Sequence, residues 1–284
     1  MTPLRQAIQD AAVLLAAAGV ESPRWDAEQL AAHVLSVSRT SLPVIPNLDA
    51  PQQAAYAELV VRRAGREPLQ HIVGAVGFRY VELAVGPGVF IPRPETEDVA
   101  GAAVDAARIA LGRPVVVDLC AGSGAIALSV AHEVPNATVH AVELDETALT
   151  WLRRNADARS RAGDKPITIH QADVAHAVPE LDGTADVVVS NPPYVADDEI
   201  HDTQPEVRDH DPRLALVAGA DGLDVIRLVE RAAARLLKDG GRVVVEHSDR
   251  QGESAPAVFG EGWADVRDHR DLAGRPRYVT ATKA

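Results

Sequence analysis

Beyond Arg113 the sequence alternates apolar runs with helical patterns, and this alternation limits the possible folds more than any other feature. Val115–Val117 is a run of β-branched residues, and a helical pattern over Ala125–His132 follows it. The remaining candidates are strands at Ala137–Leu144, Ile167–His170, Ala185–Ser190, Gly241–His247, Trp263–Val266 and Arg277–Thr282 and a helix at Glu146–Arg159. Such repeats place parallel strands side by side with helices on both faces. The sequence therefore predicts an α/β fold with a doubly wound, largely parallel sheet of seven strands.

The first 75 residues lack this alternation and have the pattern of short helices. An apolar stripe at helical spacing ends before Gly19; it consists of Leu4, Ile8, Ala11, Ala12, Leu15 and Ala18. The pattern recurs over Trp25–Leu35 and Ala50–Ala64, with prolines between the two segments. No cluster of catalytic residue types occurs here. We therefore expect residues 1–75 to form a helical domain that docks the substrate.

A linker and the start of a longer helix separate this region from the alternating one. Glycines punctuate two β-rich runs, Phe78–Leu83 and Val89–Ile91, which favours a β-hairpin linker over residues 76–92. Pro92–Glu97 then combines prolines with acidic residues, a composition that suits the positive end of a helix. A helix to about Leu111 is predicted, within a C-terminal domain of residues 93–284.

Composition narrows the class of protein. The 284 residues are 46% hydrophobic and 24% charged, and they include a single cysteine, Cys120. A lone cysteine excludes a disulfide framework and fits a reducing compartment. No run of about 18 apolar residues suggests a membrane span, and the N-terminus lacks the pattern of a signal peptide. We therefore expect a cytoplasmic protein, and the pattern favours a monomer without membrane contacts.

The charge distribution bears on the choice of partner. Residues 1–80 hold seven basic and seven acidic residues, so the rest of the chain carries the whole net charge of −13. Nucleic-acid-binding proteins normally present a basic surface, so direct nucleic acid binding is not expected. A local basic group remains at Arg62, Arg63 and Arg66, for which contact with a partner and a solvated helix face are equally good interpretations.

A glycine-rich turn follows the first strand of the alternating region. It covers Asp118–Ala125 and opens the next helix, at the end of the sheet where such folds bind ligands. Glu143 ends the second strand, nineteen residues after Gly124. A carboxylate at that position can accept hydrogen bonds from both hydroxyl groups of a ribose. The turn and Glu143 together predict a site for a nucleoside-containing cofactor.

Two cofactor classes fit this turn. The glycines at 122 and 124 with Ala127 also satisfy the nicotinamide-dinucleotide fingerprint, which expects an acid about 20 residues later. Asp118 favours the other class, S-adenosylmethionine, because the positively charged methionine end of that methyl donor prefers a nearby carboxylate. The turn alone does not separate the two.

The tetrapeptide Asn191-Pro192-Pro193-Tyr194 follows the strand candidate that ends at Ser190. Two prolines stiffen the turn and remove two N–H donors. The Asn191 side-chain oxygen and the Pro192 carbonyl are left as rigid acceptors. Methylation of an amide or aryl amine needs such acceptors, because they hold the two N–H groups and stabilise developing positive charge. Tyr194 offers a flat face to the planar substrate, so Asn191, Pro192 and Tyr194 are the predicted catalytic residues.

The chain resembles a known family over nearly its whole length. The tetrapeptide and the glycine turn are similar to those of amino methyltransferases. Further segments resemble the HemK-type release-factor glutamine methyltransferases: Pro68–Gly74, Phe90–Glu97, Pro205–Val207, Ala215–Leu216, Asp221–Leu223 and Glu246–His247. That family combines a helical N-terminal domain, a hairpin linker and a Rossmann-like methyltransferase domain. It methylates N5 of the glutamine in the Gly-Gly-Gln loop of class 1 peptide chain release factors.

The resemblance implies roles for particular residues. For the methyl donor S-adenosyl-L-methionine, the implied binding residues are Asp118, Ala121, Gly122, Ser123, Gly124, Ala125, Glu143, Asp173, Val174 and Asn191. For the glutamine substrate they are Asn191, Pro192, Pro193, Tyr194, Arg93 and Pro94. Three positions depart from the family pattern: Val174 replaces an aromatic residue, Asp211 a glutamate and Ser248 a glycine.

Other interpretations stay open at this point. Asp197–Asp211 is acidic and contains His201 and His210, but its irregular spacing favours a solvated active-site loop over a metal site, and no metal is expected. A nucleic-acid amino methyltransferase is the alternative enzyme, although it would need a basic region for capturing a base. A nucleotide-binding module without catalytic activity would leave the tetrapeptide unexplained.

Overall fold

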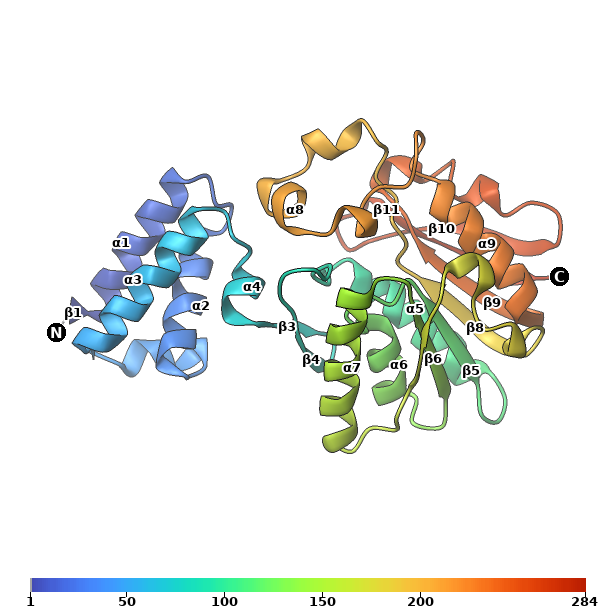
Figure 1. Cartoon of the computed structure of the whole chain (residues 1–284), viewed down its shortest axis with the longest axis horizontal. Helices are drawn as coiled ribbons and strands as arrows, with labels where there is room; N and C mark the ends of the chain where they lie inside the picture. Colours follow the sequence, from blue (N-terminus) through green and yellow to red (C-terminus); the bar gives the residue numbers. More distant parts are fainter. Residues whose placement is uncertain (1) are drawn as a thin grey trace. The chain divides into compact units, whose positions relative to one another are not determined.

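The computed structural model describes residues 2–284, which divide into two compact units (Figure 1). The helical unit contains residues 2–75 together with the distant segment Gln204–His210. The sheet unit contains Val76–Thr203 and Asp211–Ala284. The sequence analysis placed residues 204–210 with the C-terminal domain, whereas the structure groups them with the N-terminal helices.

Five helices build the helical unit, together with a 3₁₀ turn and a pair of very short strands. They are α1 (Leu4–Ala17), α2 (Pro23–Leu35), α3 (Ala50–Ala64), α4 (Leu69–Val73) and α8 (Pro205–His210), with η1 (Arg39–Val44), β1 (Thr2–Pro3) and β2 (Asn47–Leu48). The predicted stripe of α1 is buried from Leu4 to Leu15, whereas Ala18 lies beyond the helix end. Asp49 caps α3 by accepting a hydrogen bond from Gln52 N, as expected for an N-cap aspartate.

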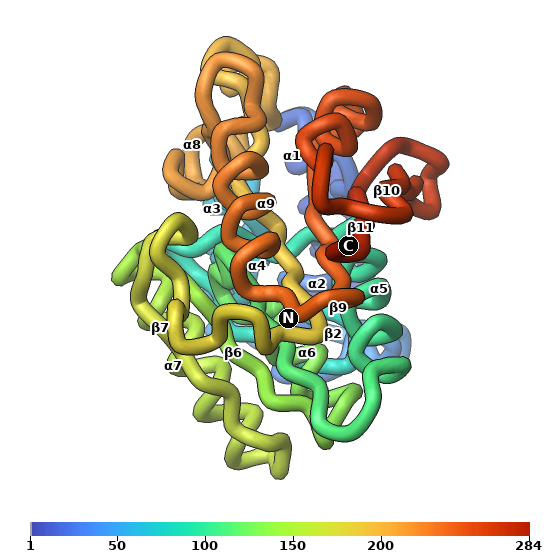
Figure 2. The backbone as a smooth tube through the Cα atoms, turned by 90° about the vertical axis from the view of Figure 1, so that its right-hand side faces the viewer, coloured from blue at the N-terminus to red at the C-terminus, as the bar shows by residue number. Residues whose placement is uncertain are grey.

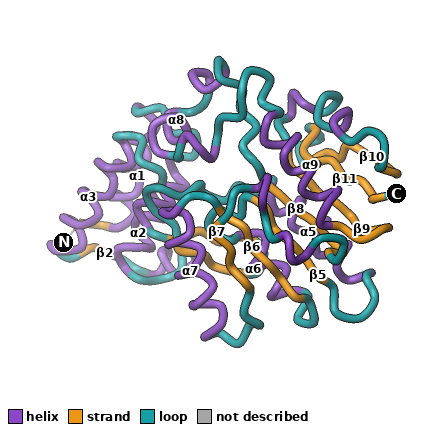
Figure 3. Tube along the Cα trace, turned by 45° about the vertical axis from the view of Figure 1, so that its right-hand side comes forward, coloured by secondary structure: helices purple, strands orange, loops and turns teal. Residues whose placement is uncertain are grey.

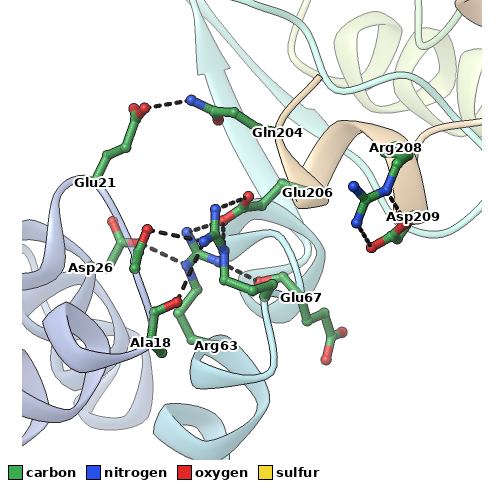
Figure 4. A network of polar contacts seen from close by, with 11 residues as sticks. Ala18, Glu21, Asp26, Arg63, Glu67, Gln204, Glu206, Arg208 and Asp209 are labelled. Carbon is green, nitrogen blue, oxygen red and sulfur yellow. Dashed lines mark hydrogen bonds and ion pairs between the residues drawn. The ribbon is translucent and has the colours of Figure 1, made fainter. Parts of the chain in front are cut away.

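A buried ion-pair network holds α8 in the helical unit (Figure 4). The Arg63 guanidinium lies 2.7 Å from Asp26 and 2.8 Å from Glu206, and all three side chains are largely covered. Arg66 donates two further hydrogen bonds to Glu206. The Glu206 pKa falls to about 2, because the hydrogen bonds from Arg66 and Arg63 outweigh the opposing effect of burial. The solvated-face interpretation is therefore wrong for Arg63.

The linker forms a hairpin at a different place from the one predicted. Its strands are β3 (Ala75–Phe78) and β4 (Val81–Ala84), joined by a turn in which Arg79 has a φ of 49°. The run Phe78–Leu83 is therefore split by a turn, and Val89–Ile91 forms no strand. Val89 and Ile91 are buried as loop residues, so their apolar character reflects packing rather than strand pairing.

The sheet unit has the predicted seven-stranded sheet, drawn in orange in Figure 3. Its strands are β5 (Val115–Leu119), β6 (Thr138–Glu143), β7 (Thr168–Gln171), β8 (Ala185–Ser190), β9 (Leu237–Glu246), β10 (Trp263–Arg270) and β11 (Pro276–Lys283). Their order is β10-β11-β9-β8-β5-β6-β7. The neighbours from β9 to β7 pair in parallel, whereas β11 is antiparallel to both β9 and β10.

Helices cover both faces of this sheet. One face packs against α5 (Thr96–Ile109), α6 (Ala125–Glu133) and α7 (Glu146–Arg161), and the other packs against α9 (Asp224–Leu236). Figure 2 shows α9 running beside β9. The sequence analysis did not identify α9, although its buried residues Ile226, Val229, Ala233 and Leu236 follow helical spacing. The predicted doubly wound arrangement is confirmed.

Candidate active site

The order of the strands creates a topological switch point at the carboxyl end of the sheet. From β5 the chain continues through β6 and β7 on one side, and it then returns to place β8 on the other side of β5. In open α/β sheets, ligands bind at such a switch point. The glycine turn follows β5 and the tetrapeptide follows β8. Leu119 and Ser190 are register partners, and Ser190 Oγ donates to Leu119 O at 2.7 Å, so the two segments leave the sheet together.

The two glycines of the turn have different surroundings. Gly122 has a φ of 56°, and a Cβ built on it would meet no atom within 4 Å. Gly124 has a φ of 90°, but a Cβ there would lie 2.5 Å from a Leu152 methyl group. Gly124 therefore lets α6 pack against α7, whereas Gly122 borders open space that a ligand can occupy. Ser123 and Ala125 are buried, so their side chains present little surface to a ligand.

Glu143 braces this turn through its carboxylate. Its Oε2 accepts from Gly122 N at 2.8 Å, and its Oε1 accepts from the N–H groups of Leu144 and Asp145, each at 2.8 Å. Each carboxylate oxygen offers about two acceptor sites. One site remains, on Oε2. In this arrangement Glu143 can accept one ribose hydroxyl, and a second requires release of a backbone partner.

Asp118 is a buried carboxyl group directly beneath the turn. Its Oδ2 accepts from Ala127 N at 2.9 Å, whereas its Oδ1 has no hydrogen-bond partner among the described residues. Burial raises the Asp118 pKa to about 8, partly opposed by the Ala127 hydrogen bond. A cation beside Asp118 would favour the ionised form. The unpartnered oxygen and the raised pKa both fit a positively charged ligand.

The other residues expected to bind the methyl donor follow β7. Asp173 is exposed, and its side chain accepts from Ala175 N at 2.8 Å, which starts a 3₁₀ turn at Val174. Val174 is buried at 9% exposure. It therefore presents little area for stacking on an adenine ring.

Backbone and side-chain contacts hold the tetrapeptide from outside its own segment. The N–H groups of Tyr194 and Val195 both donate to Leu216 O, at 3.2 and 2.8 Å. Gln251 is buried, and its Nε2 donates to the carbonyl oxygen of Tyr194 at 3.2 Å. Gly222 comes so close that a Cβ there would lie 2.4 Å from the same oxygen. The turn is fixed by three segments far from it in sequence.

The polar side chains of the tetrapeptide point to two buried partners. Asn191 Nδ2 donates to Thr96 Oγ1 at 3.2 Å, and Tyr194 OH donates to Glu246 Oε1 at 3.2 Å. Burial raises the Glu246 pKa to about 7, although the Thr96 side-chain hydrogen bond lowers it. No described residue donates a hydrogen bond to Asn191 Oδ1. The oxygen of Asn191 is therefore the atom left for a substrate.

Comparison with known proteins places the chain in a family. A family model described as the PrmC N-terminal domain matches residues 6–74, and a methyltransferase small domain matches residues 103–207. A release factor glutamine methyltransferase from Streptomyces coelicolor is 55% identical and covers 100% of this chain and 99% of its own length. One from Mycolicibacterium smegmatis is 48% identical, with the same coverage of both chains. The chain belongs to the release factor glutamine methyltransferase family.

Membership of the release factor glutamine methyltransferase family resolves two open questions. It confirms the resemblance seen in the sequence, and it assigns S-adenosyl-L-methionine as the methyl donor. The nicotinamide alternative is therefore excluded. A relative from Streptomyces pristinaespiralis with a different name, 4-amino-L-phenylalanine/4-methylamino-L-phenylalanine methyltransferase, is 41% identical and covers 90% of this chain and 87% of its own length.

Two further predicted substrate residues lie before α5. Arg93 donates to Asp211 Oδ2 at 2.5 Å and stacks over Phe90 at 4.9 Å, and Pro94 is exposed. The Asp211 side chain is fully covered. The departure at Asp211 therefore keeps a carboxylate that pairs with Arg93. Arg93 therefore anchors the end of the Asp197–Asp211 segment.

Several site residues were not identified from the sequence. Thr96, Glu246, Gly222 and Gln251 contact the tetrapeptide, although three of them fall within segments that resembled the family. Their sequence neighbours gave no signal of this role, because each contact spans at least 28 positions of the chain. At the departure Ser248, the side-chain Oγ accepts from Arg250 N at 3.3 Å and caps the 3₁₀ turn that contains Gln251. The Ser248 N–H, which a glycine would also supply, donates to Gln251 Oε1 at 3.0 Å.

Three other features are not found among the described residues: a metal site, a reactive thiol and a membrane-spanning helix. Among residues 2–284, no group of three His, Cys, Asp or Glu side chains is arranged to hold a metal ion. Cys120 is half-buried, and desolvation raises the pKa of its thiol, which disfavours the nucleophilic thiolate. No described helix is both long and apolar enough to cross a membrane.

Proposed function

We propose that this protein transfers a methyl group from S-adenosyl-L-methionine to the side-chain amide nitrogen N5 of the glutamine in the Gly-Gly-Gln loop of class 1 peptide chain release factors. The observation that carries the proposal is the hydrogen bonding of the Asn191 side-chain amide. Its amide nitrogen is held by Thr96, while its oxygen is left free, one residue after β8 and beside the glycine turn.

An amide nitrogen is a poor nucleophile because its lone pair is delocalised into the carbonyl group. Asn191 Oδ1 and the Pro192 carbonyl would accept the two N–H hydrogens of the substrate amide. Those hydrogen bonds orient the nitrogen and stabilise the positive charge that develops as the N–C bond forms and the S–C bond breaks. The nitrogen then loses one proton, which restores a neutral secondary amide.

The donor supplies an electrophilic methyl group on a sulfonium. We assign its binding to the turn beside β5 and to the ends of β6 and β7. Gly122 would let it approach the backbone, and Glu143 Oε2 would accept one ribose hydroxyl. The unpartnered oxygen of Asp118 would face its positive methionine end, and Asp173 and Val174 would lie near the adenine. The open space at Gly122 supports this assignment.

A protein substrate also needs a docking surface away from the glycine turn and the tetrapeptide. We propose that the helical unit docks the release factor, and that the protein acts as a monomer in the cytoplasm without binding nucleic acid directly. The near-neutral charge of residues 1–80 supports a protein partner over a phosphate backbone.

A second candidate is methylation of a free aromatic amine. The relative from Streptomyces pristinaespiralis favours it, since its name gives an amino-phenylalanine substrate and it is 41% identical. An aryl amine also presents a planar nitrogen with two N–H groups, so the same acceptors suit it. The higher identity of 55% to a release factor enzyme supports the protein substrate.

One experiment separates these substrates and the nucleic-acid alternative. The protein is incubated with isotopically labelled donor and, in separate reactions, with a class 1 release factor, 4-amino-L-phenylalanine or duplex DNA. We expect label on the release factor only. Label on the amino acid or on DNA, with an unlabelled release factor, would contradict the proposal.

A further inference from the structure

Asn191 can serve as an acceptor only if its side-chain amide is turned the right way. The oxygen and nitrogen of an asparagine amide exchange places on a half rotation, and a nitrogen facing the substrate would present N–H groups to N–H groups. The prolines fix the backbone of the turn but not this rotation. Some other group must set it.

Thr96 is placed to set the rotation. It is the first residue of α5, only 2% exposed, and its Oγ1 accepts from Asn191 Nδ2 at 3.2 Å. A hydroxyl group has a single proton to donate. Thr96 selects the nitrogen of Asn191 over its oxygen only while that proton points away from Asn191.

Glu246 is the group toward which that proton can point. It ends β9, directly after Val245, the register partner of Ser190, so Glu246 and Asn191 leave neighbouring strands at the same level. The Glu246 side chain is fully buried, its Oε2 has no hydrogen-bond partner among the described residues, and the nearby Thr96 hydroxyl lowers its pKa. Tyr194 OH donates to the same carboxylate at 3.2 Å. An ionised carboxylate only accepts hydrogen bonds, so both hydroxyl groups must donate toward it.

We propose that Thr96 and Glu246 are positioning residues for methyl transfer: the Glu246 carboxylate orients the Thr96 hydroxyl, which in turn holds the Asn191 amide with its oxygen toward the substrate nitrogen. The proposal rests on the proposed function for the substrate, but the orientation of Asn191 is a property of the protein alone. Protonation of Glu246 would allow the carboxyl group to donate, and the direction of the whole chain of hydrogen bonds could then reverse.

The charged and titratable groups facing Glu246 come from three elements. Glu95, before α5, opposes its ionisation, and Arg277 on β11 favours it; Tyr194 contributes its hydroxyl. Arg277 is itself paired with Asp271 at 3.2 Å. Burial outweighs the lowering effects of Thr96, Arg277 and Tyr194 and raises the Glu246 pKa to about 7. Its folded pKa lies above its ordinary value, so the carboxylate is lost as the pH falls below about 7.

The first test uses Thr96→Val, which keeps the shape of the side chain but removes its hydroxyl, with Thr96→Ser as the matched control. The valine variant loses the hydrogen bond that orients Asn191, so we expect its kcat on a release factor to fall about tenfold. Thr96→Ser should stay near the parent, and donor affinity should not change in either. In the Asn191→Ala background, Thr96→Val should have no further effect, because Thr96 acts through Asn191. Equal fold-losses in both backgrounds would overturn the proposal.

The second test uses Glu246→Gln, whose amide can both donate and accept. We expect the kcat of the parent to fall as the pH decreases below about 7, by up to about tenfold per pH unit. Glu246→Gln should be slower near pH 8 and lack this dependence. An identical pH profile in the parent and the variant would contradict the role of Glu246. Thermal melting shows whether each variant is folded.

A third measurement does not depend on activity, so it separates this inference from the proposed substrate. The side-chain amide protons of Asn191 are followed by NMR in isotope-labelled protein. We expect slow hydrogen exchange of one Nδ2 proton in the parent and in Thr96→Ser, and fast exchange in Thr96→Val. If the Nδ2 proton exchanges slowly in the parent but the parent does not methylate a release factor, only the proposed function is overturned. Fast exchange in the parent, or no change in Thr96→Val, would overturn the positioning role.

Discussion

The glycine turn and the tetrapeptide leave adjacent strands, yet the protein holds them in different ways. The turn is held by groups on β5 and β6: Asp118 accepts from Ala127 N nine positions away, and Glu143 accepts from Gly122 N across 21 positions. The tetrapeptide is held by residues far away in the sequence, from Thr96 to Gln251. The methyl-donor side is thus specified by the single stretch from β5 to β6, whereas the substrate side needs segments from Thr96 to Gln251 to come together.

This difference predicts where substitutions act. Changes around the turn should alter donor affinity and leave the catalytic step intact. Changes around the tetrapeptide should alter turnover, or the stability of the sheet unit, and leave donor affinity intact.

The largest effect is expected for Asn191→Ala, which removes one of two acceptors aimed at the developing charge. Loss of one such preorganised group typically costs about 10²–10³ in turnover. We expect that loss in kcat at saturating donor and release factor. Asn191→Asp keeps an acceptor and should retain partial activity. Turnover close to that of the parent in Asn191→Ala would mean that Asn191 only shapes the turn.

The next largest effect is expected for Gly222→Ala, whose added methyl group would crowd the tetrapeptide. Gly222 has a φ of 69°, and a Cβ would lie 2.4 Å from the Tyr194 carbonyl oxygen. Backbone strain and overpacking together should lower the free energy of unfolding by about 2–4 kcal/mol. Gly240→Ala is the matched control, because Gly240 has a φ of 75° but no atom within 4 Å of its Cβ. Denaturant unfolding checks both; equal losses would mean that the close approach is unimportant.

A smaller effect is expected for Glu143→Gln on the donor side. The amide keeps one acceptor for the backbone N–H groups but removes the charge, and hydrogen bonds to charged groups are the stronger ones. We expect the donor Kd to rise about tenfold, equivalent to ~1.4 kcal/mol, with kcat unchanged at saturating donor. Glu143→Ala is the less informative change, because it also removes the brace of the turn. Calorimetry showing an unchanged Kd would exclude the ribose contact.

The smallest effect is a pH dependence of donor affinity at Asp118. Its folded pKa of about 8 lies far above the ordinary value, so the carboxyl group ionises as the pH rises through about 8. A cationic donor prefers the ionised form. The advantage of the parent over Asp118→Asn in donor affinity should therefore grow as the pH rises to about 8, and then level off. A ratio independent of pH would exclude contact with the positive end.

The same difference explains how much the sequence could predict. The seven strands, the glycine turn and Glu143 were predictable because their signals are local: β-branched runs, glycines and an acid at a fixed spacing. The partners of the tetrapeptide were not, because Thr96 and Gln251 become its neighbours only once α5 and β9 have packed. Residues 204–210 show the same limit, since their place beside Arg63 depends on ion pairs that span more than a hundred positions.

The most direct test of the account locates the transferred methyl group. A class 1 release factor is methylated by the parent protein and digested, and the peptide with the Gly-Gly-Gln sequence is fragmented in a mass spectrometer. The account predicts one added methyl group on the side-chain nitrogen of that glutamine, and none when the glutamine is replaced by glutamate. A methyl group on another residue, or equal labelling of the glutamate variant, would contradict it.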